Sequence, residues 1–325
     1  MPRLFALLLC LFANLAQAAP YPVLHRPYDL DTPTGTLHGS LMLPQTATPP
    51  PVALLIAGSG PTDRDGNNPQ GRNAYLLRLS EALAQRGIAS VRFDKRGIAA
   101  SHAAAPLETQ LSVEGYADDV VAWSRQIGQD PRFGPLVLVG HSEGALIASL
   151  AAPRTAAAAL VVIAGSGRPI DALLREQLQP RLPAPLLQQA DHLLDQLRAG
   201  RVQPQVPDEL QALFRPSVQP YLISLFRHDP AQAFAAVKQP ALILQGTHDI
   251  QVDVADAQAL AKARPQAQLQ LIAGMNHILR IAPADARAQL AAYNDPRLPL
   301  ARELVERLSQ FIETTTQKGA MPPTS

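Results

Sequence analysis

One short segment constrains the fold more than any other, because it joins a buried strand to a helix through a very tight turn. Four apolar residues, 136–139, predict the strand, and residues 145–150 predict a helix of small side chains packed on it. Between them lies Gly-His-Ser-Glu-Gly, residues 140–144, a G-x-S-x-G pattern. Larger side chains at the two glycines would collide in such a turn. The pattern therefore predicts a strained serine, Ser142, whose hydroxyl is exposed at the carboxyl end of the strand.

Strands are predicted at 52–57, 88–93, 136–139, 159–164, 240–245 and 269–273. The run at 52–57 is continuously apolar, which is typical of a strand that is covered on both faces. Residues 35–44 instead alternate between apolar and polar side chains, as in an antiparallel strand. Helical patterns separate these runs, at 74–86, from the capping residue Ser112 to 127, and at 300–311. We therefore predict an α/β fold with a mostly parallel central sheet and helices on both faces.

The alternation of strands and helices breaks between residues 168 and 237, where leucine-rich helical patterns are interrupted by prolines. A strand resumes at 240–245, so we predict that 168–237 is a helical cap inserted above the carboxyl edge of the sheet. The core of the domain then consists of residues 19–167 and 238–313. We expect residues 314–325 to form a disordered tail.

The first 18 residues have the marks of a secretory signal peptide. Arg3 precedes an apolar run that is too short to span a bilayer, and Ala16-Gln17-Ala18 matches an A-x-A cleavage site. Cleavage after Ala18 removes Cys10, the single cysteine, so neither disulfides nor thiolate metal ligands are expected in the mature protein. We therefore expect a periplasmic or secreted protein whose fold is held by its core.

The charge balance argues against two classes of partner. The chain has 28 basic and 27 acidic residues, and loss of Arg3 makes the numbers equal. Basic residues do not cluster, so neither nucleic acid nor an anionic membrane surface is an expected partner. No later apolar run approaches the length of a membrane span, so we expect no stable membrane insertion.

A serine hydroxyl needs a base within hydrogen-bonding reach, and the base needs a group that fixes its tautomer. In folds that place the nucleophile on a strand-turn-helix, the acid and then the histidine follow on loops after late strands. Asp249 follows the penultimate predicted strand, and His277 follows the last one. We predict that Ser142, His277 and Asp249 form a catalytic triad.

Each assignment has alternatives. The acid could be a different aspartate, namely Asp253, Asp256 or Asp171, with Asp249 as a turn residue. Three other histidines could in principle serve as the base, namely His248, His228 and His192, but only His277 combines the final strand end with the right chain order. We assign His141, next to the nucleophile, to packing.

Negative charge on the carbonyl oxygen of a bound substrate needs preset donors, each worth on the order of 3 kcal/mol. We predict that the N–H of Glu143 is one donor and the N–H of Ser59, after the strand at 52–57, is the other. The same loop contains charged residues that could touch substrate or pair with one another, namely Asp63, Arg64 and Asp65. Three residues after the next strand look structural, namely Asp94, Arg96 and Gly97.

These motifs, together with Ala57 to Asn67 and Phe93-Asp94-Lys95-Arg96-Gly97, resemble the secreted bacterial carboxylesterases of the α/β-hydrolase superfamily. The resemblance covers roughly residues 35–312, and it implies a Ser-Asp-His triad with no metal and no cofactor. There are two departures. Ala57 stands where many relatives have His, and Ile98-Ala99-Ala100-Ser101 lacks the Gly of the common Ile/Tyr-Gly-x-Ser continuation.

The resulting hypothesis is a serine carboxylesterase that hydrolyses short-to-medium acyl esters of small molecules through an acyl-enzyme on Ser142. The alternatives are a peptidase or a thioesterase that uses the same triad, since the cap rather than the triad selects the substrate. A lipase and a non-catalytic binding protein on the same fold are further alternatives.

Overall fold

The computed structural model describes residues 21–318, in which eight strands form one sheet. The order across the sheet is β1-β4-β6-β5-β7-β8-β9-β10. All neighbours from β6 to β10 are parallel, and β4 runs antiparallel to both of its neighbours. The strands are β1 (Val23–Pro27), β4 (Gly39–Pro44), β5 (Val52–Ile56), β6 (Ala89–Phe93), β7 (Leu136–His141), β8 (Ala159–Ile163), β9 (Ala241–Gly246) and β10 (Gln268–Ile272).

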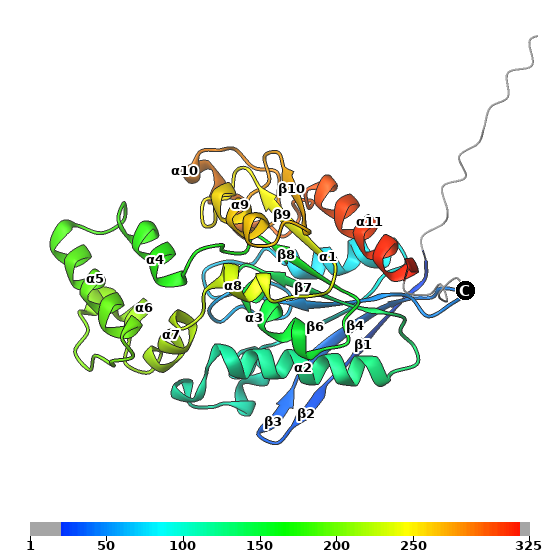
Figure 1. The fold of residues 1–325 in the computed structure, drawn as a ribbon, viewed down its shortest axis with the longest axis horizontal. Coiled ribbons are helices and arrows are strands. Elements are labelled where there is room, and N and C mark those ends of the chain that lie inside the picture. Colours follow the sequence, from blue (N-terminus) through cyan, green and yellow to red (C-terminus); the bar gives the residue numbers. More distant parts are fainter. Residues whose placement is uncertain (1–20, 319–325) are drawn as a thin grey trace, which may run out of the picture.

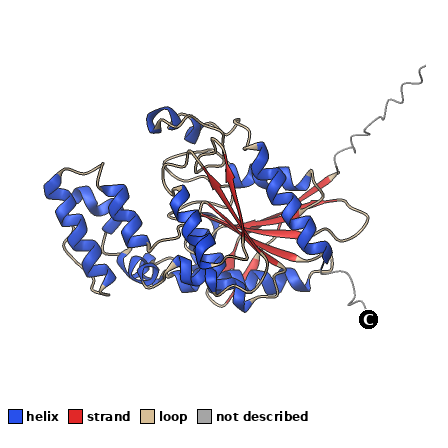
Figure 2. Cartoon of the chain, turned by 45° about the horizontal axis from the view of Figure 1, so that its top comes forward, coloured by secondary structure: helices blue, strands red, loops and turns tan. Residues whose placement is uncertain are grey.

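Helices cover both faces of this sheet (Figures 1 and 2). Two helices lie on one face, α1 (Tyr75–Ala84) and α11 (Arg302–Lys318). Four lie on the other, α2 (Val113–Gln129), α3 (Glu143–Ala151), α8 (Pro230–Ala235) and α9 (Val254–Ala263). Successive side chains of the central strand β5 point to opposite faces of the sheet. Val52, Leu54 and Ile56 pack in the core under α2, α3, α8 and α9. Ala53 and Leu55 pack in the core under α1 and α11. The predicted α/β fold with a mostly parallel sheet is confirmed.

The segment between β8 and β9 is helical. It contains α4 (Ile170–Leu178), α5 (Ala184–Arg198), the short turn η4 (Asp208–Leu210), α6 (Gln211–Phe214) and α7 (Gln219–Phe226). Figure 1 shows α4 to α7 gathered to the left of the sheet, where α7 packs against α2 and α5. Helix α8 differs from the other helices of this segment, because it packs against α3 and α9 of the core.

Residues 35–44 form two strands rather than the single strand predicted. Strand β3 (Gly35–Leu37) pairs with β2 (Leu30–Thr32) in a separate hairpin, and β4 starts at Gly39. At the break, the His38 N–H donates to Ser101 Oγ at 2.9 Å instead of to a strand. A Cβ at Gly39 would lie 2.4 Å from the Tyr28 carbonyl oxygen, so this close crossing requires glycine.

The final helix is longer than the sequence pattern predicted. Helix α11 continues to Lys318, so residues 314–318 are helical and not part of a disordered tail. Thr314 and Thr316 donate their hydroxyls to the carbonyl oxygens four residues earlier, both at 2.8 Å, which lets threonine remain inside the helix. The predicted signal peptide and residues 319–325 lie outside the described residues. None of the helices in residues 21–318 has the length and apolarity of a membrane span.

Trp123 of α2 is the largest fully buried side chain, and its ring packs against Phe93 of β6 at a centroid distance of 5.3 Å. We expect Trp123→Ala to lower the free energy of unfolding by about 3–5 kcal/mol through the cavity it creates, and Trp123→Phe to cost less. Denaturant unfolding followed by circular dichroism measures both. Leu290→Ala is the control, because this leucine is 62% exposed and its loss should change the free energy by no more than about 0.5 kcal/mol. Equal effects of all three changes would contradict this account of the core.

Candidate active site

Ser142 lies in a sharp turn between β7 and α3, with φ 55° and ψ −123°. A Cβ at Gly140 would lie 2.2 Å from the carbonyl oxygen of Gly144, and one at Gly144 would lie 2.3 Å from the carbonyl oxygen of Ile56. The Ser142 N–H donates to the Ile163 carbonyl at 2.9 Å, which anchors the turn to the neighbouring strand β8. Both glycines are therefore sterically required, as the sequence pattern predicted.

His277 and Asp249 lie on loops at the carboxyl ends of β10 and β9, which are adjacent and parallel. His277 Nε2 is 3.1 Å from Ser142 Oγ, and His277 Nδ1 is 2.7 Å from Asp249 Oδ2. The imidazole side chain is 6% exposed and the carboxylate side chain is fully buried. The structure thus brings the three predicted triad residues into one continuous chain of hydrogen bonds.

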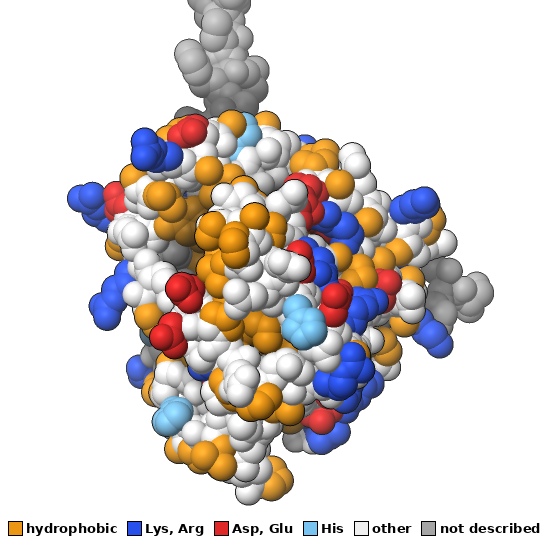
Figure 3. All heavy atoms as spheres, turned by 90° about the vertical axis from the view of Figure 1, so that its left-hand side faces the viewer, with side chains coloured by type: hydrophobic (Ala, Val, Ile, Leu, Met, Phe, Trp, Pro, Cys, Tyr) orange, Lys and Arg blue, Asp and Glu red, His pale blue; other side chains and the backbone are white. Residues whose placement is uncertain are grey.

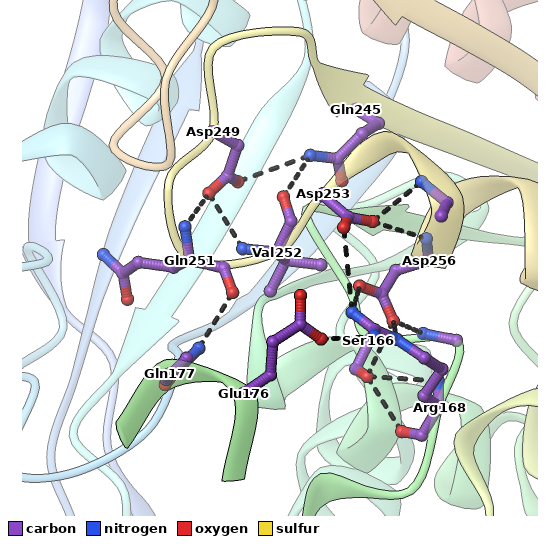
Figure 4. Close-up of polar contacts among 12 residues, drawn as sticks. Ser166, Arg168, Glu176, Gln177, Gln245, Asp249, Gln251, Val252, Asp253 and Asp256 are labelled. Atoms are coloured by element: carbon purple, nitrogen blue, oxygen red, sulfur yellow. Dashed lines mark hydrogen bonds and ion pairs between the residues drawn. The ribbon is translucent and has the colours of Figure 1, made fainter. Parts of the chain in front are cut away.

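The loop around Asp249 keeps its carboxylate ionised. Asp249 Oδ1 accepts hydrogen bonds from the N–H groups of Gln251 at 2.8 Å and Val252 at 3.0 Å (Figure 4). Burial alone would raise the pKa of Asp249, but His277 and these two N–H groups outweigh it and lower the pKa below its usual range. An anionic Asp249 accepts from Nδ1–H of His277 and leaves Nε2 free to take a proton from Ser142.

The alternative acids have other structural partners. Asp253 caps α9 by accepting the N–H groups of Ala255 and Asp256. Asp256 pairs with Arg168 at 2.8 Å (Figure 4), and Asp171 pairs with Arg198 at 2.5 Å. None of these carboxylates contacts the imidazole of His277.

The alternative bases also lie elsewhere. His248 Nδ1 is 2.7 Å from the carbonyl oxygen of Ala282, and His228 pairs with Glu114 at 2.9 Å. His192 is exposed on α5. The structure therefore places none of the three next to Ser142.

His141 has a more specific environment than the packing role expected from the sequence. Its Nε2 lies 2.8 Å from the carbonyl oxygen of His277, and its Nδ1 lies 2.9 Å from the hydroxyl of Tyr75. A carbonyl can only accept, so Nε2 donates, and the Tyr75 hydroxyl donates to Nδ1 of the neutral ring. Burial, followed by the nearby His277, lowers the pKa of His141 to about 3. His141 is thus a neutral residue that holds the backbone carbonyl of His277.

The two predicted oxyanion donors flank Ser142. Ser59 and Glu143 line the same pocket as the serine, and Gly58 packs so closely that a Cβ there would lie 3.1 Å from Ser142 Cβ. Glu143 is the first residue of α3, so its N–H has no partner within the helix. The Ser59 N–H finds no acceptor among residues 21–318. Both N–H groups are available to a substrate oxygen.

The charged residues of the loop after β5 stabilise the loop itself. Asp63 accepts the N–H groups of Asp65 and Asn67, at 2.9 and 2.8 Å. Arg64 pairs with Asp94 at 2.8 Å, and Asp65 pairs with Arg92 at 2.9 Å. These contacts favour the internal ion-paired loop over direct contact with substrate.

The loop after β6 forms its turn despite the missing glycine. Ala99 takes a positive φ of 45°, and the Gly97 N–H donates to the Ser101 carbonyl at 3.0 Å. Arg96 pairs with Asp119 of α2, which agrees with its expected structural role. The substitution of Ala for Gly therefore leaves the turn in place.

A pocket of about 360 Å³ opens above Ser142. The helical segment between β8 and β9 contributes apolar side chains to its wall, including Leu173, Leu174 and Leu222. Figure 3, which looks onto the cap side, shows hydrophobic side chains in patches among acidic and basic ones. In the described part of the chain, no group of three or more His, Cys, Asp or Glu residues could hold a metal ion.

Lys95 also lines this pocket, is only 2% exposed, and was not expected from the sequence pattern to belong to the site. Its ammonium lies 3.5 Å from the carboxylate of Glu143 and 5.2 Å from the centre of the Tyr116 ring. Burial lowers the pKa of Lys95, while the Glu143 carboxylate opposes this effect. One feature of the sequence could have indicated that Lys95 belongs to the site: it closely follows the buried strand β6, at the carboxyl edge of the sheet where Ser142 lies.

The environment of His141 gives stability a specific pH dependence. Its pKa is about 3 in the folded protein, against an ordinary value of 6.5, so between these values the unfolded chain binds a proton that the folded protein does not. Stability from this residue is therefore lost as the pH falls below 6.5. We expect the stability advantage of the wild type over His141→Gln to shrink by about 1.4 kcal/mol per pH unit in this window. Urea unfolding of both proteins from pH 7 to pH 4 measures it, and a constant difference would contradict the assignment.

The sequence is similar to known hydrolases, which agrees with the fold described above. Residues 73–281 match the family described as serine aminopeptidase, S33. Esterase EstD from Thermotoga maritima is 25% identical over 252 residues, which make up 77% of this chain. The alignment spans 59% of the length of EstD.

Two solved structures share the fold at low sequence identity. Est1E from Butyrivibrio proteoclasticus has a TM-score of 0.58 at 18% identity, and the match covers 89% of this chain and 98% of Est1E. The α/β hydrolase GrgF from Penicillium sp. sh18 has a TM-score of 0.60 at 17% identity, and the match covers 90% of this chain and 99% of GrgF. The chain therefore has the α/β-hydrolase fold and belongs to the serine aminopeptidase, S33, family of serine hydrolases.

Proposed function

We propose that this protein is a serine carboxylesterase that hydrolyses short-to-medium acyl esters of small molecules. One observation supports this most strongly: the hydrogen-bond chain from Asp249 through His277 ends at Ser142, and Ser142 lines a mostly apolar pocket. The similarity to esterase EstD points in the same direction.

Acylation follows from this geometry. Ser142 Oγ attacks the ester carbonyl carbon while His277 Nε2 takes its proton, and Asp249 stabilises the imidazolium that forms. The carbonyl oxygen becomes an oxyanion and accepts hydrogen bonds from the N–H groups of Ser59 and Glu143. When the tetrahedral intermediate collapses, the bond to the alcohol oxygen breaks and His277 returns the proton to the departing alcohol. The product is an acyl-enzyme on Ser142.

Deacylation repeats these steps with water as the nucleophile. His277 takes a proton from the water, whose oxygen attacks the acyl carbon, and then gives that proton to Ser142 Oγ as the acid departs. No other reactant is required. The same residues therefore serve both halves of the cycle, and neither a metal nor a cofactor has a step to perform.

The charges in the pocket favour an ester over the amino terminus of a peptide, the substrate implied by the family description. An aminopeptidase needs a carboxylate or another acceptor for the free ammonium of its substrate. Only two carboxylates line the pocket in the described residues, Glu108 and Glu143, and each is already paired, with Arg215 and Lys95 respectively. The remaining wall is mostly apolar, which suits an acyl chain. The volume of about 360 Å³ lies within the range of small-molecule sites.

The substrate test is a series of p-nitrophenyl esters of increasing acyl length, with an aminoacyl-arylamide and an acyl thioester for comparison. We expect the highest kcat/KM on short-to-medium esters. Ser142→Ala and His277→Ala should lower kcat by about 10⁴-fold or more, because the two residues act as a unit. Arylamide or thioester turnover above ester turnover would instead support the peptidase or thioesterase alternative. Ester turnover that survives in Ser142→Ala would overturn the proposal.

We further propose that the protein is periplasmic or secreted. The support is the signal-peptide pattern of residues 1–18. We expect the exported protein to begin at Ala19, and N-terminal sequencing of material from a cell fraction outside the cytoplasm checks this. A protein that retains Met1 and stays in the cytoplasmic fraction would contradict it.

A further inference from the structure

One buried side chain connects both donors of the oxyanion hole. Lys95, at the end of β6, donates from Nζ to the carbonyl oxygen of Gly58. The same ammonium lies 3.5 Å from the carboxylate of Glu143. Gly58 precedes Ser59 in the chain, and Glu143 itself supplies the second N–H. A single cation thus contacts the backbone next to one donor and the side chain of the residue that provides the other.

The contact with Gly58 sets the direction of the neighbouring N–H. In a trans peptide, the carbonyl oxygen and the following amide hydrogen point in opposite directions. A carbonyl of Gly58 that is held by Lys95 therefore turns the N–H of Ser59 to the opposite side of the same peptide plane. Gly58 packs against Ser142, where a Cβ would come within 3.1 Å of the Ser142 Cβ, and Ser59 lines the pocket beside the serine. The contact between Lys95 and the Gly58 carbonyl thus sets the direction of the Ser59 N–H relative to Ser142.

Thr62 Oγ1 holds the next carbonyl, that of Ser59, at 2.8 Å, but Lys95 is the one hydrogen-bond partner of the Gly58–Ser59 peptide itself among the described residues. The Gly58–Ser59 peptide belongs to neither a strand nor a helix, Ser59 is exposed, and Gly60 has a positive φ of 66°. A glycine at position 58 also permits more backbone orientations than any other residue. A rotated peptide would place the carbonyl oxygen where the N–H should be, and this oxygen would repel the oxyanion. A fixed donor is worth more than a mobile one, because no reorganisation is needed during the reaction.

Burying the Lys95 ammonium costs desolvation free energy, so its position next to the pocket requires an explanation. Lys95 is 2% exposed and Glu143 is 9% exposed, and a buried ion pair adds little stability compared with apolar side chains of the same size. The pair borders the pocket instead of filling the core. We propose that Lys95 is a positioning residue that fixes the Gly58–Ser59 peptide, and through it one of the oxyanion donors. This inference rests on the proposed function of Ser142.

The first variant is Lys95→Met, which keeps the apolar stem and removes the ammonium. Loss of a whole oxyanion donor costs on the order of 100- to 1000-fold in kcat, so we expect a mobile donor to cost about 10- to 100-fold. KM for the p-nitrophenyl ester should change by less than about threefold, because the donor acts mainly in the transition state. Inhibition by a trifluoromethyl ketone, which forms an oxyanion on the serine, should weaken by about the same factor as kcat. Lys95→Arg should recover part of the loss.

A second variant separates the loss of the contact between Lys95 and the Gly58 carbonyl from the effect of leaving the Glu143 charge unpaired. Lys95→Met leaves the Glu143 carboxylate buried without a partner, and this charge could itself disturb folding or repel the oxyanion. Lys95→Met combined with Glu143→Gln removes both charges and keeps the backbone N–H of residue 143. We expect the double variant to fold and to retain the loss in kcat, and Glu143→Gln alone to lose less. Lys262→Met, at an exposed lysine on α9, is the matched control and should behave as the wild type.

Three results would overturn the inference. Unchanged kcat and ketone inhibition in a folded Lys95 variant would show that the peptide is held without it. A rise in KM with constant kcat would make Lys95 a substrate-binding residue. A kcat of the double variant equal to that of the wild type would show that Lys95 only neutralises the charge of Glu143. If wild-type activity does not require Ser142, the proposed function fails; if it does and the Lys95 variants are normal, only this inference fails.

Discussion

The strained backbone of Ser142 is the constraint on which the rest of the site depends. A non-glycine residue with φ 55° and ψ −123° costs about 1–3 kcal/mol, and it persists only where its surroundings leave no alternative. Here the surroundings are backbone: the carbonyls of Gly144 and Ile56 occupy the space that side chains at 140 and 144 would need. The turn projects Oγ beyond the sheet and starts α3 immediately after it. One conformation therefore supplies both the proposed nucleophile and the N–H of Glu143 that we propose as an oxyanion donor.

The remaining parts reach Ser142 from loops at the same edge of the sheet. Strand β9 lies beside β8 and β10 lies beside β9, and the loops after these two strands carry Asp249 and His277. The loops after β5 and β6 carry Ser59 and Lys95. His141 links two of these groups, since it lies next to the serine and holds the carbonyl of His277. The proposed chemistry thus depends on strands that have a hydrophobic core on each face of the sheet. The helices between β8 and β9 add apolar side chains to the pocket wall, whereas the proposed catalytic residues lie on loops at the edge of the sheet.

The sequence allowed much of this to be predicted, for physical reasons that differ between elements. Buried parallel strands appear as continuous apolar runs, and the two glycines around Ser142 identify the turn by sterics alone. Asp249 and His277 could be placed from chain order, because both follow late strands.

The break at His38 was missed because the alternating pattern continues through it, and the turn depends on Asp29 and Ser101, which are distant in the sequence. The helical threonines after 313 were missed because their stabilising contacts are local hydrogen bonds rather than an apolar stripe. Lys95 and His141 act through backbone carbonyls of other loops, and such contacts leave no pattern in one sequence.

The proposed mechanism requires that Ser142 is acylated during turnover. The most direct measurement is the intact mass of the protein after rapid acid quench with a short-chain p-nitrophenyl ester, followed by peptide mapping of the adduct. We expect a mass increase of one acyl group, located on the peptide that contains Ser142 and absent from Ser142→Ala. Turnover with the acyl group on a different residue, or turnover by the variant at the wild-type rate, would contradict it.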